Sequence, residues 1–472
     1  MSCSKSEEIF QEYQVNSFFM KSYCFLCAMN DLCFFIERKD SVSDIPSINL
    51  YKNIKGTSGV QRYANNGKSK RNKMTKDQTE DKQRHTRPYI QRIGICVLLL
   101  MVAVAFGHLP VSKAESTSLK DMPVGAQSAV LMEQSSGRIL YEKDPHTKRR
   151  IASITKIMTA IIAIESGKMD KTVTVSNSIL KSEGSAIYLK PGEKIKLSDL
   201  VYGLMLRSGN DAAIAIAEYV GGSVDGFAVL MNDKAKWIGM ENTHFTNPHG
   251  LDDSDNHYSS AYDMAILTQY AMKNKMYRKI AGTKVHRAPN PDEVWDRVWK
   301  NKNKLLTEKY KYCTGGKTGF TKKARRTLVT TASKDNLDLI VVTIDDSTDW
   351  ADHIALYEEG FKEYQLTEVV PKGKVKGIKH GFYKNRAYLT SPLEYPLTDK
   401  EMKEIKVTYK LQKPKKQWKK GKKLPDTIGK VHLMLNGKSV RSKPVYLKKE
   451  QETVLNLWKN QLKLFAGLET NG

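Results

Sequence analysis

The chain has 472 residues with 27% charged and 40% hydrophobic side chains, an ordinary composition for a globular protein of two or three domains. Its net charge of +26 is uneven: residues 366–472 carry 25 basic and 9 acidic side chains, whereas residues 115–365 are nearly neutral. No segment resembles a nucleic-acid-binding motif, so nucleic acid is excluded as a partner. An anionic membrane surface or an anionic wall polymer fits the basic tail better, and a solvated face is the alternative.

The first recognisable segment is an export signal at residues 74–114. Three arginines between residues 84 and 92 precede an apolar run, 93–106, and small residues follow at Ser112 and Ala114. This order predicts a secretory signal peptide that is cleaved after Ala114. The run of 14 residues is short for a membrane span, although a retained anchor is the alternative.

A signal peptide normally stands at the N-terminus, and this one begins only near Met74. We therefore expect synthesis to start at Met74, with residues 1–73 absent from the working protein; a cytoplasmic extension is the alternative. Five of the six cysteines precede the cleavage point, which leaves Cys313 alone in the exported chain. No intramolecular disulfide is then possible. Cys313 is interpreted as a small buried hydrophobe, and the alternative is a thiol close enough to Lys317 for a bulky thiol reagent to disturb the site.

Residues 115–365 have the pattern of an α+β catalytic domain, in which helices pack on an antiparallel sheet. Turn residues between apolar, β-branched runs predict a hairpin at each end of the region, and apolar runs between them predict buried helices. The hairpins are expected at 129–141 and 327–343, and the helices at 151–165, 197–206, 212–219, 261–272 and 349–361.

Residues 366–448 are predicted to form a small, basic, β-rich domain. Apolar and polar residues alternate from Ile405 to Leu411, and Asn436-Gly437 is a strong hairpin-turn signal between two apolar strands. Residues 449–467 form a predicted amphipathic helix. This helix would either lie on a membrane surface or pack on its own domain.

Three short motifs carry the chemistry. Ser153 and Lys156 are spaced to share one face of a helix, so an apolar environment and a nearby cation would let the lysine accept the serine proton. Ser208-Gly-Asn210 is expected in a loop between helices, and Lys317-Thr-Gly319 on a strand edge. Ser-x-x-Lys spacing occurs twice elsewhere in the chain, whereas Lys-Thr-Gly occurs once, so order and context carry the assignment.

With these motifs in this order, the chain resembles the low-molecular-mass penicillin-binding proteins, the serine D-alanyl-D-alanine carboxypeptidases. The resemblance runs from about Pro123 to the C-terminus. It implies a transpeptidase-like catalytic domain followed by a β-sandwich-like domain. The stretches that carry it are Ile151-Ala-Ser-Ile-Thr-Lys-Ile-Met-Thr159, Met205-Leu-Arg-Ser-Gly-Asn-Asp-Ala-Ala213, Phe245-Thr-Asn-Pro-His-Gly-Leu251 and Gly316-Lys-Thr-Gly-Phe-Thr321.

The resemblance also implies a role for each motif residue. Ser153 would be acylated by the terminus of a peptidoglycan stem peptide, with Lys156 as its base, and Ser208 and Asn210 would relay protons and hold the peptide. Lys317, Thr318 and Gly319 would bind the terminal carboxylate. The backbone N–H groups of Ser153 and Phe320 would form the oxyanion hole. β-Lactams would then be inhibitors.

The chain departs from the family where many members carry Ala-Gly a few residues after Lys-Thr-Gly. Here the residues are Ala324-Arg325-Arg326, a basic pair expected at the rim of the cleft. The sequence from Phe320 to Leu328 resembles that of the sporulation branch of the family.

Two other functions stay open at this point. A β-lactamase on the same scaffold would need a carboxylate to activate water, and no loop carboxylate is assigned to that role. A non-catalytic wall- or membrane-binding homologue is the other. The histidines lack the spacing of a zinc site, Asn247-Pro-His-Gly250 is interpreted as a structural turn, and no metal or cofactor is expected.

Overall fold

The computed structural model describes residues 118–290, 293–419 and 423–448, together with the single residues Ile95, Val97, Leu98, Met101 and Leu462. Internal contacts divide the chain into two units, Met1–Val111 and Ser112–Gly472, and the elements below belong to the second. The predicted N-terminal extension, signal peptide and C-terminal amphipathic helix lie outside the described ranges, so these segments stay predictions.

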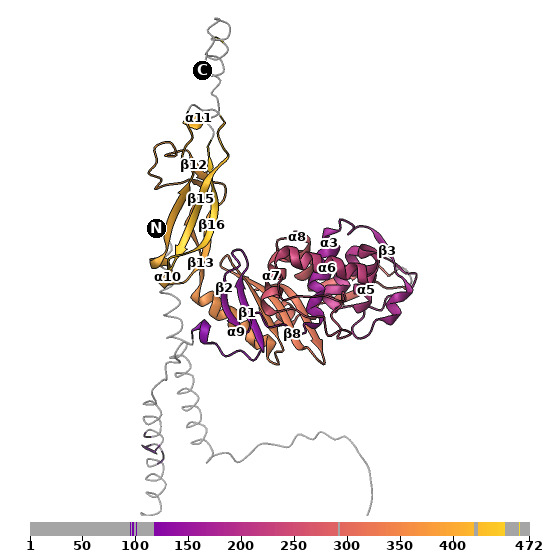
Figure 1. Ribbon diagram of the computed structural model, residues 1–472. Helices are drawn as coiled ribbons and strands as arrows, with labels where there is room; N and C mark the ends of the chain where they lie inside the picture. The colour runs from indigo at the N-terminus through magenta and orange to yellow at the C-terminus, as the bar shows by residue number, and fades with distance from the viewer. Residues whose placement is uncertain are drawn as a thin grey trace, which may run out of the picture. The chain divides into compact units, whose positions relative to one another are not determined.

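The catalytic domain is built on a five-stranded antiparallel sheet with the strand order β2-β1-β9-β8-β7. The N-terminal hairpin therefore pairs with strands that come about 200 residues later, and Figure 1 shows these purple and orange strands side by side. Both predicted hairpins are confirmed. The strands are β1 (Ser128–Glu133), β2 (Ile139–Lys143), β7 (Cys313–Thr321), β8 (Arg325–Lys334) and β9 (Leu337–Ile344).

Both faces of this sheet are buried, because strand side chains alternate between two cores. On β9, Ile340 and Val342 pack with the helical part of the domain, whereas Leu339 and Val341 pack with the side that α9 (Asp349–Glu363) covers. A sheet covered on both sides explains why its strands are apolar runs rather than clean polar–apolar alternations.

The helical part holds the first two motifs. The predicted helices are confirmed, except that the first turn of the 151–165 segment is a 3₁₀ turn, η2 (Ala152–Thr155), and two further helices, α6 and α8, were not predicted. The helices are α3 (Lys156–Glu165), α4 (Leu197–Arg207), α5 (Asn210–Gly221), α6 (Val224–Ile238), α7 (Ala261–Met272) and α8 (Lys275–Ala281).

Burial explains why these segments are helices. Nine of the ten residues of α3 are buried, so its apolar sequence packs on nearly every side. Polar side chains cap other helices: Ser223 accepts a hydrogen bond from the Gly226 amide at α6, and Ser260 accepts one from the Asp263 amide at α7. Within the described ranges, no single helix is long and apolar enough to cross a membrane, and α5 with α6 passes that test only as a pair bent by 81°.

The C-terminal region forms a second sheet with the order β11-β12-β16-β15-β14 and a separate antiparallel pair, β10–β13, around one core. Asn436 and Gly437 both have positive φ in the β15–β16 turn, as the Asn-Gly signal predicts. The strands are β10 (Gln365–Val370), β11 (Gly373–Lys374), β12 (Ala387–Leu389), β13 (Leu393–Leu397), β14 (Lys406–Leu411), β15 (Thr427–Leu435) and β16 (Lys438–Leu447).

Candidate active site

Ser153 lies in the 3₁₀ turn η2, directly before α3, and a tight backbone contact holds this turn. Ala152 has a φ of +49°, which is strained for a residue with a side chain. Gly250 packs beneath it at φ +83°, and a Cβ at position 250 would lie 1.9 Å from the Ala152 carbonyl oxygen. Only glycine fits there, so the Asn247-Pro-His-Gly250 turn supports the backbone next to Ser153.

Lys156 is fully buried and its Nζ contacts three acceptors. Nζ lies 2.9 Å from Ser153 Oγ, 2.6 Å from Asn210 Oδ1 and 2.7 Å from the His249 carbonyl oxygen. The predicted Ser153–Lys156 pair is therefore brought into hydrogen-bond contact. The contact to the His249 carbonyl was not predicted, because a backbone acceptor leaves no signal in residue type.

The surroundings of Lys156 favour its neutral form. Burial lowers the pKa of Lys156 well below the ordinary lysine value, and the positive charges of Lys317 and Lys302 lower it further. A neutral amine donates two hydrogens and keeps one lone pair. With Asn210 Oδ1 and the His249 carbonyl oxygen accepting the two hydrogens, the lone pair faces the Ser153 hydroxyl.

Ser208 and Asn210 approach this pair from the α4–α5 junction. Ser208 caps α4 in the left-handed conformation, φ +65°, and Asn210 is the first residue of α5 rather than a loop residue, which corrects the prediction for this motif. The next residue, Asp211, is buried and accepts hydrogen bonds from the Ile187 and Leu189 amides. This carboxylate fixes the 183–189 loop, whose Glu183 carbonyl accepts a hydrogen bond from Asn210 Nδ2.

Lys317, Thr318, Gly319 and Phe320 lie within β7, the edge strand of the sheet, as predicted. Lys317 Nζ donates to Ser208 Oγ at 3.1 Å and to the Thr318 carbonyl at 2.6 Å. Burial and the nearby Lys302 lower the pKa of Lys317 to about 7. A Cβ at Gly319 would lie 2.9 Å from the Ser153 amide nitrogen, so glycine lets β7 approach Ser153 closely.

These groups open onto a cleft of about 310 Å³. Lys302, which belongs to none of the three motifs, donates to Ser185 Oγ at 3.0 Å and adds a cation to the wall. Lys156, Asn210 and Lys317 lie behind this wall as buried groups. The lining residues are Ser153, Ser185, Ser208, Lys302, Thr318, Gly319, Phe320, Arg326, Asp349 and Trp350.

Comparison with known proteins identifies the family. A family model described as D-alanyl-D-alanine carboxypeptidase matches residues 113–348, half of the chain, and a second, described as the penicillin-binding protein 5 C-terminal domain, matches residues 364–453. The chain belongs to the D-alanyl-D-alanine carboxypeptidase family. The predicted fold, a transpeptidase-like α+β domain followed by a β-sandwich-like domain, is confirmed.

Curated members of the carboxypeptidase family match most of this chain. DacF of Bacillus subtilis is 33% identical over 308 residues, covering 62% of this chain and 78% of DacF. DacA of Haemophilus influenzae is 31% identical over 357 residues, covering 70% and 88%. Among solved structures, penicillin-binding protein 5 of Haemophilus influenzae has a TM-score of 0.58 at 28% identity, covering 70% of this chain and 98% of that chain.

The departure from the family pattern after Lys-Thr-Gly has a backbone explanation. Arg325 has a φ of +59° at the start of β8, a conformation that favours glycine. The family resemblance leads us to expect glycine there, whereas this chain has an exposed arginine in the same turn. Arg326 instead turns toward the cleft wall.

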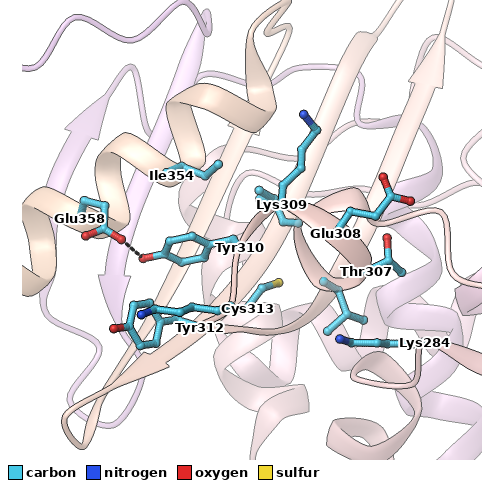
Figure 2. Close-up of a pocket in the computed structure, with 12 residues that line it drawn as sticks. Lys284, Thr307, Glu308, Lys309, Tyr310, Tyr312, Cys313, Ile354 and Glu358 are labelled. Carbon is cyan, nitrogen blue, oxygen red and sulfur yellow. Dashed lines mark hydrogen bonds between the residues drawn. The ribbon is translucent and has the colours of Figure 1, made fainter. Parts of the chain in front are cut away.

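A second pocket, of about 530 Å³, lies at the other end of β7 (Figure 2). Its lining includes Tyr310, Tyr312 and Cys313, and the Tyr310 hydroxyl donates to Glu358 Oε1 at 2.7 Å. Cys313 is half-buried and its thiol donates to the Gly315 carbonyl, so it behaves as a weakly polar packing residue. Burial raises the pKa of the Cys313 thiol to about 11.

The histidines near the nucleophile are packing and hydrogen-bonding groups. Burial lowers the pKa of His249 to about 3 and that of His257 to about 4, and His257 Nε2 lies 2.9 Å from Thr155 Oγ1. Within residues 118–290, 293–419 and 423–448, no group of three His, Cys, Asp or Glu side chains is placed to hold a metal ion.

Proposed function

We propose that this carboxypeptidase releases the terminal D-alanine from peptidoglycan stem peptides through an ester on Ser153. One observation carries the proposal: a buried lysine, Lys156, lies 2.9 Å from the hydroxyl of a serine that opens onto a cleft. A serine hydroxyl is a weak nucleophile until a base takes its proton, and a lysine kept neutral is such a base.

In the first half of the reaction, the neutral Lys156 takes the Ser153 proton while Oγ forms a bond to the carbonyl carbon of the penultimate residue. The oxyanion that forms would accept hydrogen bonds from the Ser153 and Phe320 amides. As the carbon–nitrogen bond breaks, the departing D-alanine amine takes a proton from Lys156 through Ser208, and the acyl group stays on Ser153.

In the second half, water replaces D-alanine. Lys156, again neutral, takes a proton from water as the oxygen attacks the ester carbonyl, and the proton passes to Ser153 as the ester bond breaks. The balance is one water consumed and one D-alanine released. Asn210 would hold Lys156 and the peptide backbone throughout.

The terminal carboxylate of the substrate would lie against Lys317 and Thr318. Lys317 is buried beside Ser208, so its protonated form offers a desolvated positive charge at the cleft wall. Gly319 keeps this strand close enough for the carboxylate and the scissile carbonyl to be bound together.

A carboxypeptidase and a β-lactamase differ in the rate at which a penicilloyl ester on the serine is hydrolysed. Asp349 supplies the one carboxylate among the described residues that line the cleft, and it is bonded to Arg326. We therefore expect a penicilloyl ester on Ser153 to be long-lived.

Carboxypeptidases similar to penicillin-binding protein 5 act on the cell wall outside the cytoplasm.

For this chain we propose in addition that the C-terminal domain binds an anionic membrane surface or wall polymer. Exposed Lys410 and Lys430 stand directly opposite each other on β14 and β15, and Lys406 lies on the same face. Like charges in cross-strand positions are unfavourable unless a counter-charge is present. Co-sedimentation with anionic vesicles or isolated cell wall, lost on Lys410→Gln with Lys430→Gln, would support this; unchanged co-sedimentation would contradict it.

The proposed reaction is tested by incubating the exported chain with a peptide that ends in D-Ala-D-Ala and measuring free D-alanine. We expect release by the wild type and none by Ser153→Ala. Equal release by both proteins, or release by neither, would reject the proposal.

A further inference from the structure

The 183–189 loop beside the Ser153 cleft holds Tyr188 in a strained and exposed position. The φ of Tyr188 is +62°, a left-handed conformation that is an outlier for a bulky residue. Tyr188 is also 84% exposed, so burial of its side chain does not offset the strain. Strained residues persist where the surrounding structure fixes them, and they concentrate at active sites and ligand-binding sites. This conformation therefore points to a function for the tyrosine side chain.

The backbone is fixed on both sides of Tyr188 by one buried carboxylate. The Ile187 amide donates to both Asp211 oxygens at 3.0 Å, and the Leu189 amide donates to Asp211 Oδ2 at 3.1 Å. The side chains of Ile187 and Leu189 are buried in the core of the helical part. Because both neighbours are turned inward and held there, the side chain of Tyr188 is held outward.

The same loop forms part of the Ser153 cleft. Ser185 lines this cleft, its carbonyl accepts a hydrogen bond from the Asn210 amide at 2.7 Å, and its hydroxyl accepts one from Lys302. Three residues of extended chain span at most about 11 Å, so the Tyr188 backbone lies within that distance of the cleft wall at Ser185. A stem peptide longer than the reacting dipeptide extends beyond the reaction centre, and this loop is a wall that its upstream residues can follow.

We propose that Tyr188 is a substrate-binding residue whose ring packs against the stem peptide upstream of its last three residues. This inference takes its peptide class from the proposed function. A tyrosine offers an apolar face to aliphatic side chains and a hydroxyl to backbone amides, and it has only two side-chain torsions to fix on binding. Because Asp211 already fixes the loop, binding requires little further ordering of the protein.

A loop that is strained only in order to bury Ile187 and Leu189 is the competing explanation. In that case the side chain at position 188 has no role, and glycine would be preferred there because it adopts φ +62° without strain. Tyr188→Gly separates the two explanations. It should keep the fold under both, and it should weaken the binding of a long peptide only if Tyr188 contacts the substrate.

The test measures Kd for the full chain carrying Ser153→Ala, which cannot form the acyl ester. The two probes are the pentapeptide of a peptidoglycan stem and its C-terminal tripeptide, both ending in D-Ala-D-Ala. We expect the pentapeptide to have a Kd about tenfold lower than that of the tripeptide, as for an aromatic side chain that makes one good contact. Adding Tyr188→Gly should bring this ratio to about one, whereas Tyr188→Phe keeps the ring and should preserve the ratio.

Asp335→Gly is the matched control, because Asp335 is an exposed residue with a φ of +52° in the turn between β8 and β9, and it should leave the ratio unchanged. Urea unfolding of Tyr188→Gly should give a midpoint at or above that of the parent protein, since the strain is relieved. Equal Kd values for the two peptides, or a ratio that Tyr188→Gly leaves unchanged, would overturn the assignment. Release of D-alanine by the protein with native Ser153 is scored separately, so failure of the proposed reaction does not decide the Kd ratio.

Discussion

The two pockets that border β7 differ in chemistry more than in size. The larger, at Cys313, is walled by tyrosines and holds a thiol whose pKa is raised by burial. The smaller, at Ser153, is backed by the buried Lys156 and Lys317, whose pKa values are lowered by burial and by neighbouring cations, Lys302 in both cases. In one pocket burial makes a thiol less reactive, and in the other it favours the neutral form of Lys156, which the proposed reaction needs as a base. Volume alone therefore does not identify the site.

The largest expected effect comes from removing the base. Lys156→Met should lower the rate of acylation by penicillin by about a thousandfold, because Lys156 is the one group among the described residues that is hydrogen-bonded to Ser153 Oγ. The rate is measured as covalent labelling over time. The matched control is Lys181→Met, which alters an exposed lysine with the same spacing from Ser178 and should leave the rate unchanged. Labelling of Lys156→Met within tenfold of wild type would contradict lysine as the base.

The backbone support of the nucleophile gives the next effect. Gly250→Ala should destabilise the protein by about 3 kcal/mol or more, since its Cβ would collide with the Ala152 carbonyl at 1.9 Å. Gly239→Ala is the control, because it has a similar φ of +86° with nothing within 4 Å, and it should cost about 1 kcal/mol. Urea unfolding measures both. Equal losses would show that the contact beneath Ser153 adds nothing.

The pH dependence should separate the two lysines. Acylation falls as pH drops through the pKa of Lys156, because the protonated amine cannot accept a proton. The pKa of Lys317 is about 7, so above that pH the free enzyme loses the charge that binds the carboxylate, and KM should rise by about tenfold for each further pH unit. Peptides with a C-terminal amide in place of the carboxylate should show no such rise. A KM that is flat from pH 6 to 9 would contradict this role of Lys317.

The smallest effect is expected in the other pocket. With a pKa of about 11, the Cys313 thiol should react with iodoacetamide at neutral pH on the order of a hundredfold more slowly than an exposed thiol. Cys313→Ala should change D-alanine release less than about threefold, since the Cys313 thiol is hydrogen-bonded to Asn303 and to the Gly315 carbonyl, and neither residue lines the Ser153 cleft. Fast modification of Cys313, or a large loss on Cys313→Ala, would show that this pocket is coupled to catalysis.

Motifs and periodicity predicted most of the catalytic domain and brought together Ser153, Lys156, Ser208, Asn210 and Lys317. The site residues could be predicted because a nucleophile, a base and a carboxylate-binding cation each require particular side-chain types, which are visible in the sequence. Two interactions were not predicted. The His249 carbonyl accepts a hydrogen bond from Lys156 through the backbone, which residue type does not indicate. Asp211 binds the 183–189 loop, and in the sequence a buried aspartate cannot be told from a surface one. Lys302 and Asp349 reach the cleft only through tertiary packing. The helices α6 and α8 were not predicted, although Ser223 and Asn274 cap their first turns.

The central claim is that Ser153 is the acylated nucleophile, and a fluorescent penicillin tests it most directly. Incubation with the exported chain, followed by denaturing electrophoresis and peptide mapping, should give a stable adduct on Ser153 and none on Ser153→Ala. An adduct on another residue, or equal labelling of both proteins, would contradict the account.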